Sequence, residues 1–134
     1  NTANDRNVML QQRGVPEVNK MAAASSLKFV GIGTVEMTAM TVTAGVLPQS
    51  AMQEVRDQGG VGDLIGHFFD ERGALVQTEL SDRTLSVHLE SLKTSRIVAV
   101  GGGDEKIRAI GSILRSGLLD GLVTDERTAK ALIN

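Results

Sequence analysis

The sequence has 134 residues, with 14 Lys and Arg against 16 Asp and Glu and a formal net charge of -2. That length fits one domain, and the hydrophobic content of 41% excludes a disordered chain. Because the charges balance, the sequence does not predict the basic surface that is typical of a nucleic-acid-binding domain. No cysteine is present, which excludes disulfides and thiolate metal sites. The sequence shows neither an apolar run long enough to span a membrane nor a signal peptide, so we expect a soluble, cytoplasmic protein.

The first part of the chain predicts helices around one buried strand. Apolar residues at helical spacing, interrupted by Gly14-Val15-Pro16, predict two short helices between residues 5 and 25. The apolar run over 27–33 is closed by glycines and predicts a buried strand. Residues 38–47 indicate a loop or a broken helix, and a proline followed by apolar residues in helical step predicts a helix over 48–56.

The middle of the chain is rich in glycine and turn signals. Residues 58–63 indicate a flexible glycine segment, and the apolar run over 64–69 predicts a strand that ends in a turn at 70–73. A short extended piece over 74–78 would complete a hairpin. Apolar and polar residues alternate over 84–87, which is typical of a half-buried strand.

The carboxyl end carries the clearest pattern. The continuous apolar run at 96–100 predicts a strand, and the glycines at 101–103 predict a turn. The helix that follows has one apolar stripe, which consists of Ile107, Ile110, Ile113, Leu114 and Leu118. Residues 121–124 predict another strand, and Asp125 caps a last helix. This order of strand, helix, strand and helix predicts an α/β fold with a parallel sheet.

Ligands of open parallel sheets bind at the carboxyl ends of the strands, where glycine loops meet helix amino ends. Three loops here meet that description, at 31–34, 101–106 and 124–126. The three glycines of the second loop let backbone N–H groups approach an anion. Lys106 stands in the first turn of the next helix, where positive charge is unfavourable to the helix, so it is a candidate for holding a phosphate. The alternative is a solvated surface lysine beside Glu105.

Asp63 is the second candidate for a binding residue. It follows Gly62 and precedes an apolar run, so its carboxylate has little room to reach bulk water. Its partners are either the hydroxyl groups of a sugar or the amides of its own loop, and the residues alone leave both interpretations open. The pattern around His67 and His88 favours structural histidines near the surface of the core, and their spacing fits no metal motif.

Four blocks of the sequence, in the order of the chain, resemble one protein family. They are VGIGT at 30–34, GVGDLIGHFFD at 60–70, VAVGGGDEKIRAI at 98–110 and LVTDERTA at 122–129. Together they resemble the effector-binding domain of SorC-type bacterial transcription regulators. The likeness covers the chain from about residue 27 to residue 133.

This resemblance implies a three-layer parallel sheet with helices on both faces, similar to the sugar-phosphate isomerase and glucosamine-phosphate deaminase group. It implies a domain that binds a phosphorylated sugar or related metabolite, without catalysis, cofactor or metal, in a homo-oligomer, either dimer or tetramer. By position, Asp63 would contact the hydroxyls of the effector and Lys106 its charged end. The other residues that would line the cleft are Gly31, Gly33, Thr34 and Gly102.

The sequence also departs from the family pattern. The helix-turn-helix through which the family holds DNA, and the first part of the sugar domain with its glycine-threonine phosphate loop, would precede Asn1, so we expect a single effector-binding domain that lacks its first part. His67 stands where the family usually has Arg. The alternative function is a sugar-phosphate isomerase or deaminase of the same fold with Asp63 as base, which has less support because no second titratable residue accompanies Asp63.

Overall fold

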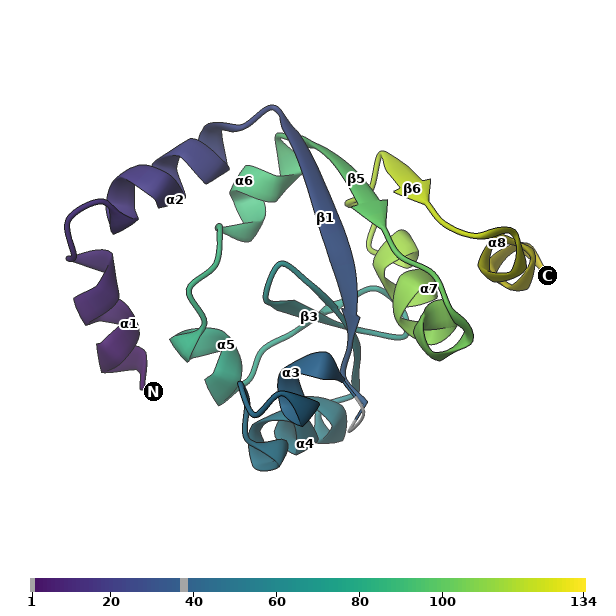
Figure 1. Ribbon diagram of the computed structural model, residues 1–134, viewed down its shortest axis with the longest axis horizontal. Helices are drawn as coiled ribbons and strands as arrows, with labels where there is room; N and C mark the ends of the chain where they lie inside the picture. The colour runs from purple at the N-terminus through teal and green to yellow at the C-terminus, as the bar shows by residue number, and fades with distance from the viewer. Residues whose placement is uncertain (1, 37–38) are drawn as a thin grey trace.

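The computed structural model describes residues 2–36 and 39–134 (Figure 1). The strands are β1 (Leu27–Thr34), β2 (Gly60–Leu64), β3 (His67–Asp70), β4 (Leu75–Val76), β5 (Arg96–Val100) and β6 (Gly121–Val123). The helices are α1 (Ala3–Leu10), α2 (Val15–Ala24), α3 (Met40–Thr43), α4 (Gln49–Asp57), α5 (Glu79–Arg83), α6 (Leu89–Lys93), the 3-10 helix η1 (Asp104–Lys106), α7 (Ile107–Arg115) and α8 (Glu126–Ile133). Within the described residues, no helix is long and apolar enough to cross a membrane.

The six strands form one sheet in the order β4-β3-β2-β1-β5-β6. β5 runs parallel to both β1 and β6, whereas β2, β3 and β4 pair antiparallel. The α/β class is therefore confirmed, and the prediction of a wholly parallel sheet is wrong. The sheet is mixed because short turns join β2 to β3 and β3 to β4, and such turns can only join antiparallel neighbours.

The antiparallel half arises from a hairpin that the sequence pattern obscured. The glycine segment expected at 58–63 is in large part strand β2, and the expected strand at 64–69 contains a two-residue turn. In that turn Ile65 has φ 52° and Gly66 has φ 76°. Left-handed conformation at two successive residues gives the backbone the twist that a tight hairpin needs. A branched residue such as Ile is unusual there, so the turn signal was weak.

The other predicted elements have mixed outcomes. Both amino-terminal helices and the carboxyl-terminal succession β5, α7, β6 and α8 are confirmed. Residues 84–87 form no strand, and this extended segment is held instead by the Ser86 hydroxyl, which donates to the Ile65 carbonyl. Within the segment 38–47, residue 38 lies outside the described residues and Met40–Thr43 form α3.

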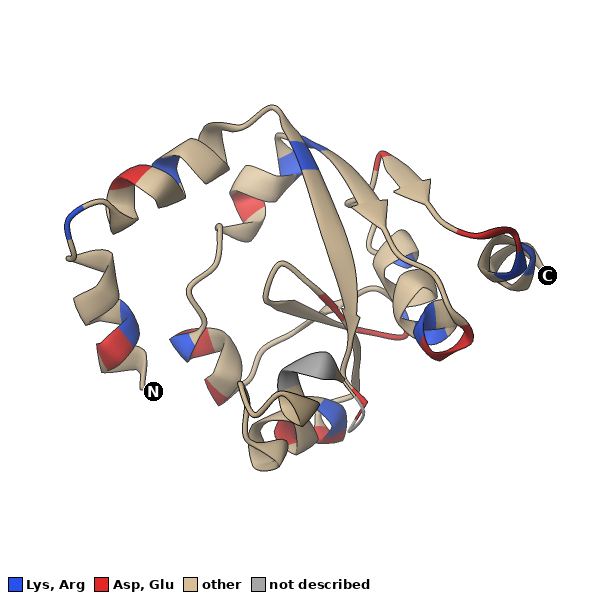
Figure 2. Cartoon of the chain, in the orientation of Figure 1, with Lys and Arg blue, Asp and Glu red and all other residues tan. Residues whose placement is uncertain are grey.

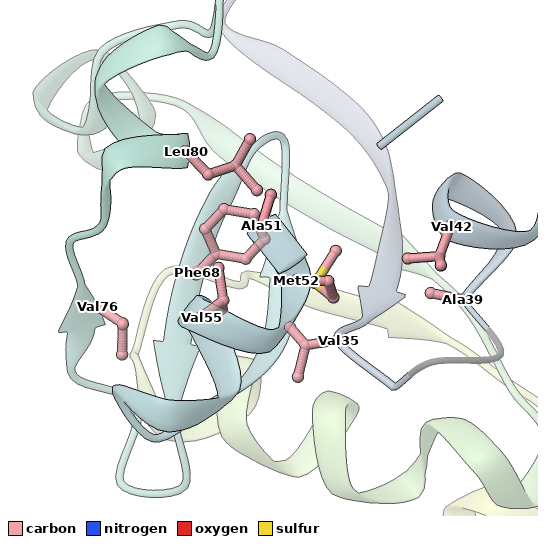
Figure 3. Packing of buried hydrophobic residues seen from close by; sticks show 9 residues of the cluster. All are labelled: Val35, Ala39, Val42, Ala51, Met52, Val55, Phe68, Val76 and Leu80. Carbon is pink, nitrogen blue, oxygen red and sulfur yellow. The ribbon is translucent and has the colours of Figure 1, made fainter. Parts of the chain in front are cut away.

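Neighbouring phenylalanines show how the antiparallel half is covered on both faces. Phe69 belongs to a buried cluster with Ile32 and Leu64 of the sheet and with Ala109, Ile110 and Ile113 of α7. Phe68, which points the opposite way, belongs to a second cluster that Figure 3 shows against α4 and its neighbours: Val35, Ala39, Val42, Ala51, Met52, Val55, Val76 and Leu80. α7 thus lies on one face and α4 on the other, as alternation along a strand requires.

Candidate functional site

A cavity of about 680 Å³ opens beside the carboxyl end of β1. Its polar lining consists of Gly33, Thr34, Asp63, Thr84, Glu105 and Lys106, and Val46, Leu47, Met52, Phe68 and Leu80 lie on its apolar side. The volume is that of a small-molecule site. Four of the six residues predicted to contact the effector therefore come together here, from β1, β2 and the loop after β5.

Asp63 is a half-buried acid that lines this cavity. It lies opposite Gly33 in the β1–β2 pairing and opposite Phe68 in the β2–β3 pairing, so its side chain is on the α4 face of the sheet. Burial raises the pKa of this carboxyl to about 6, although a hydrogen bond from the Gly66 N–H and the nearby His67 act to lower the pKa. Near neutral pH such a group exchanges a proton readily and can either accept or donate a hydrogen bond.

The two carboxylate oxygens of Asp63 have different surroundings. Oδ1 accepts the backbone N–H of Gly66 at 2.8 Å, which ties the side chain to the hairpin turn. Oδ2 points toward Gly33, where an added Cβ would lie only 2.9 Å away from it. The amide partner foreseen for Asp63 is thus present and uses one oxygen. Within residues 2–36 and 39–134, the other oxygen accepts no hydrogen bond.

Lys106 ends η1 on another side of the same cavity and is partly buried. Among the residues that the structure describes, its ammonium group has neither an ion pair nor a side-chain hydrogen bond. A lysine in such a position can hold an anion as a point charge.

The loop that carries Lys106 is fastened to the start of α8. The Gly103 N–H donates to the Thr128 hydroxyl at 2.9 Å and to Asp125 Oδ2 at 3.2 Å. Asp125 also caps α8 by accepting the Thr128 N–H at 2.8 Å, and these hydrogen bonds hold the pKa of Asp125 below its usual value. The prediction that Asp125 is a helix cap is confirmed. The geometry fixes the loop before any ligand arrives, which limits the entropy cost of binding.

Gly31 and Gly102 lie apart from the other four candidates. A Cβ at Gly102 would lie 2.2 Å from Asp125 Oδ2, so this glycine permits the close approach of the loop to α8. A Cβ at Gly31 would meet nothing within 4 Å. Neither residue lines the cavity, and a contact between either of them and the effector stays a prediction.

The sequence pattern missed other residues that line the cavity. Thr84 comes from the irregular segment after α5, and Met52 and Leu47 come from the α4 region. None of them belongs to a motif, because only the three-dimensional path of the chain brings them to the cavity. Glu105, which precedes Lys106 in the sequence, also lines the cavity.

The two histidines have different surroundings. His67 lines a separate pocket together with Val87 and not the 680 Å³ cavity, and its Nε2 is 2.7 Å from the Val87 carbonyl oxygen, to which it donates in the corresponding tautomer. His88 is exposed and precedes α6. Over residues 2–36 and 39–134 the structure contains no group of three or more His, Asp or Glu side chains that could hold a metal ion.

Comparison with known proteins identifies the family of the chain. The family described as "Putative sugar-binding domain" matches residues 1–134 in full. The chain belongs to this sugar-binding family of SorC-type transcription regulators. The likeness noted for four separate blocks is therefore a property of the whole chain.

Individual members of the sugar-binding family support this assignment. The erythritol catabolism regulatory protein EryD of Brucella abortus is 50% identical over 133 residues, which are 99% of this chain and 42% of EryD. The deoxyribonucleoside regulator of Bacillus subtilis is 27% identical over 133 residues, 98% of this chain and 42% of that protein. The full-length sorbitol operon regulator SorC of Klebsiella pneumoniae has the same fold, with a TM-score of 0.88 at 23% identity over 100% of this chain and 44% of SorC.

These relatives have a common kind of activity, and each is longer than this chain. They are transcription regulators and not enzymes, so a sugar-phosphate isomerase or deaminase has no support among them. The chain spans about 42% of the length of the curated relatives it matches. More than half of each relative thus lies outside the matched region.

Proposed function

We propose that this chain is the effector-sensing part of a bacterial transcription regulator, and that it binds a phosphorylated sugar or polyol in the cavity beside Asp63. One observation carries the proposal: a partly buried acid, and a cation that has no ion-pair partner among the described residues, face the same 680 Å³ cavity from different elements. An acid with one free oxygen suits hydroxyl groups, and an ammonium group suits a phosphate.

The names of the relatives suggest the size of the effector. EryD is named for erythritol catabolism and the Bacillus protein for deoxyribonucleosides. Erythritol is a short polyol, and a deoxyribonucleoside contains a deoxyribose sugar joined to a nucleobase. We therefore propose an effector whose sugar or polyol part has about four to six carbons, which fits a cavity of this size.

The proposed role requires binding without turnover. The effector would bind one state of the regulator more tightly than another and so shift the balance between them. DNA would be held through a part of the regulator outside this chain, in agreement with the net charge of -2 and with the interspersed basic and acidic segments in Figure 2. Assembly into a homo-oligomer belongs to the same proposal.

A thermal-melting panel tests the proposed function. The panel contains erythritol, ribitol, sorbitol and 2-deoxyribose, each with its phosphate ester. A phosphorylated compound at a hundred times its Kd should add about 2.7 kcal/mol to the free energy of unfolding. The parent alcohol should have a smaller effect, and no new product should form on long incubation. Equal shifts for each ester and its alcohol would contradict the role given to Lys106, and sustained turnover would contradict the sensor.

Lys106→Ala is the matched test of the cavity. Removing this ammonium group should weaken a phosphorylated ligand by roughly 10- to 100-fold, because a hydrogen bond to a charged group is worth about 1.5–3 kcal/mol. Affinity for the unphosphorylated alcohol should change little. Lys20→Ala is the control, since it removes the same charge from the exposed surface of α2. Titration calorimetry measures both variants, and an equal effect of the two would count against the site.

A further inference from the structure

A second, smaller cavity lies against the 680 Å³ cavity. Its volume is about 130 Å³, and it is lined from α1, the β2–β3 hairpin, β4, α5 and the segment before α6. Gly66, Phe68 and Thr84 line both cavities, which therefore share a wall. We call this smaller cavity the α1 pocket, because α1 contributes Arg6 to it and lies beside α5 in Figure 1.

The α1 pocket is lined by hydrogen-bond donors that have no partner in the protein. Arg6 Nε donates to the Thr84 carbonyl at 3.0 Å. Within residues 2–36 and 39–134, the two terminal nitrogens of Arg6 make no hydrogen bond or ion pair, and neither do the side chains of Gln77 and His88. Arg6 belongs to α1, Gln77 follows β4 and His88 precedes α6, so tertiary packing brings these donors to one place.

Other polar groups of the α1 pocket are satisfied by the protein itself. The Ser86 hydroxyl donates to the Ile65 carbonyl, and the Thr84 hydroxyl donates to the Leu80 carbonyl at 2.6 Å. His67 is held by the carbonyl oxygen described above. These hydrogen bonds fix the wall of the pocket, so the unpaired donors are the groups that a ligand would meet.

The charge of the α1 pocket is positive. Arg6 is partly buried, and none of the described residues that line the pocket is Asp or Glu. The acid next to Arg6 in the sequence, Asp5, accepts the N–H of Thr2 in the capping box of α1. A guanidinium group with two unpaired nitrogens matches two oxygens of one anion. The pocket therefore suits an oxyanion.

The volume of the α1 pocket limits this oxyanion to a small one. A cavity of about 150 Å³ holds a single benzene molecule, so a volume of about 130 Å³ has room for about six non-hydrogen atoms. Inorganic phosphate is within that limit, whereas the phosphate ester of a polyol exceeds it. The α1 pocket is therefore too small for the effector proposed above.

We propose that the α1 pocket binds inorganic phosphate, with two of its oxygens held by Arg6 and with His88 and Gln77 donating to the others. This site is distinct from that of Asp63 and Lys106. The inference therefore goes beyond the proposed function and does not depend on it.

Phosphate in the α1 pocket would fasten α1 to the rest of the chain. No side chain of α1 is buried, and Val8 and Met9 are 47% and 48% exposed. Few apolar contacts therefore hold this helix. An anion shared by Arg6, Gln77 and His88 would bridge α1 and the segments beside β4 and α6.

Two-dimensional NMR of the chain tests the phosphate site. Sodium phosphate is titrated at constant pH, and sodium chloride at matched ionic strength is the control for screening by salt. The backbone amides of Gln77 and Ser86 report on the α1 pocket, and those of Gly33 and Asp63 report on the 680 Å³ cavity.

Four variants locate the bound phosphate. Arg6→Gln removes the charge of the α1 pocket, and His88→Ala removes one donor without touching the hydrogen bond between α1 and Thr84. Arg13→Gln is the matched control, because it removes the same charge from the exposed turn between α1 and α2. Lys106→Ala removes the cation of the 680 Å³ cavity.

We expect the Gln77 and Ser86 amides to shift along a saturable curve with phosphate and not with chloride. Arg6→Gln should raise the Kd by about tenfold or more, and His88→Ala should raise it by about threefold. The two other variants should leave this Kd unchanged.

Three results would overturn the phosphate site. The first is an equal response to chloride or a response that does not saturate. The second is an unchanged Kd in both Arg6→Gln and His88→Ala. The third is loss of the response in Lys106→Ala, which would assign the phosphate to the 680 Å³ cavity and leave the proposed function intact.

Discussion

Asp63 is an acid placed where ionisation is unfavourable. Its carboxyl is partly buried among the residues that line the cavity, where the hydrogen bond from the Gly66 N–H and the nearby His67 offset only part of the effect of burial. The raised pKa means that the ionised Asp63 carboxyl lowers the free energy of unfolding at neutral pH. A ligand whose hydroxyls hydrogen-bond to this carboxyl would offset that cost, so the cost is consistent with a binding role.

Asp63→Asn should stabilise the unliganded chain at neutral pH. A folded pKa of about 6 against the usual 3.8 means that the free energy of unfolding falls as pH rises from about 4 to above 6. The loss amounts to about 3 kcal/mol. The amide variant keeps an oxygen for the Gly66 N–H and has no charge to bury. Urea unfolding at pH 4 and at pH 7.5 checks this.

The same variant should lose affinity for a hydroxyl-bearing ligand, because it no longer offers a carboxylate. Wild type and Asp63→Asn should differ least in stability at the acid end, where the wild-type side chain is also neutral. If the variant were less stable than wild type at pH 7.5, the carboxylate would be stabilising and the raised pKa would be wrong.

At the scale of elements, the turn between β3 and β4 is packed tightly on α7. The Ser112 hydroxyl donates to the Asp70 carbonyl at 2.5 Å, and Arg115 Nε donates to the Glu71 carbonyl at 2.6 Å. Gly73 has φ 81°, and a Cβ there would lie 2.3 Å from the backbone nitrogen of Ser116. The turn and the carboxyl end of α7 therefore meet backbone to backbone.

Gly73→Ala should destabilise the fold far more than Gly59→Ala. Both glycines have positive φ, 81° and 87°, but a Cβ at Gly59 would meet nothing within 4 Å. Conformational strain alone should cost Gly59→Ala about 1 kcal/mol. Gly73→Ala adds a steric overlap with helix backbone, for a total of about 3 kcal/mol or more. Chemical unfolding of both variants provides the comparison, and equal losses would show that the turn does not pack on α7 as described.

The elements differ in how well their sequence predicts them. The succession from β5 to α8 could be predicted because residues 97–100 form a continuous apolar run and Ile110 and Ile113 repeat along the helix. The β2–β3 hairpin could not be predicted, because glycines weaken the strand signal and Ile65 occupies a turn position that usually has Asn or Gly. The alternation of apolar and polar residues at 84–87 led to a wrong strand prediction, because the Ser86 hydroxyl hydrogen-bonds to the Ile65 carbonyl and not to a neighbouring strand.

The candidate site was predictable to the extent that it depends on motifs. Asp63 directly follows Gly62, and Lys106 comes shortly after the glycines at 101–103, and such glycines favour turns and close approaches of the backbone. Their position in one cavity was an expectation from the family, and the described cavity agrees with it. Thr84 and the apolar side chains near α4 have no local signal, since only tertiary packing brings them there.

For the molecule as a whole, the two halves of the sheet should differ in protection. β2 and β3 have α7 on one face and the α4 cluster on the other, whereas β6 is an edge strand with Val123 exposed. Local opening is easiest where few apolar contacts hold the backbone. The covered half therefore forms the most stable part of the isolated chain.

Hydrogen exchange of the 134-residue chain checks this difference. Amides of β2 and β3 should exchange slowest, and those of β6 about tenfold or more faster. If β6 were as protected as β3, some interaction beyond the described contacts would cover it. The experiment needs no substitution and no ligand.

Gly33 lies opposite Asp63 across the β1–β2 pairing, and a methyl group there would approach Oδ2 to 2.9 Å. A side chain at position 33 would therefore press on the carboxylate that the proposed function assigns to the effector. Because a contact of 2.9 Å forces a shift, Gly33→Ala would displace the Asp63 side chain and strain its hydrogen bond to the Gly66 N–H. Under the proposed function, one added methyl group that changes no charge would then be enough to abolish effector binding.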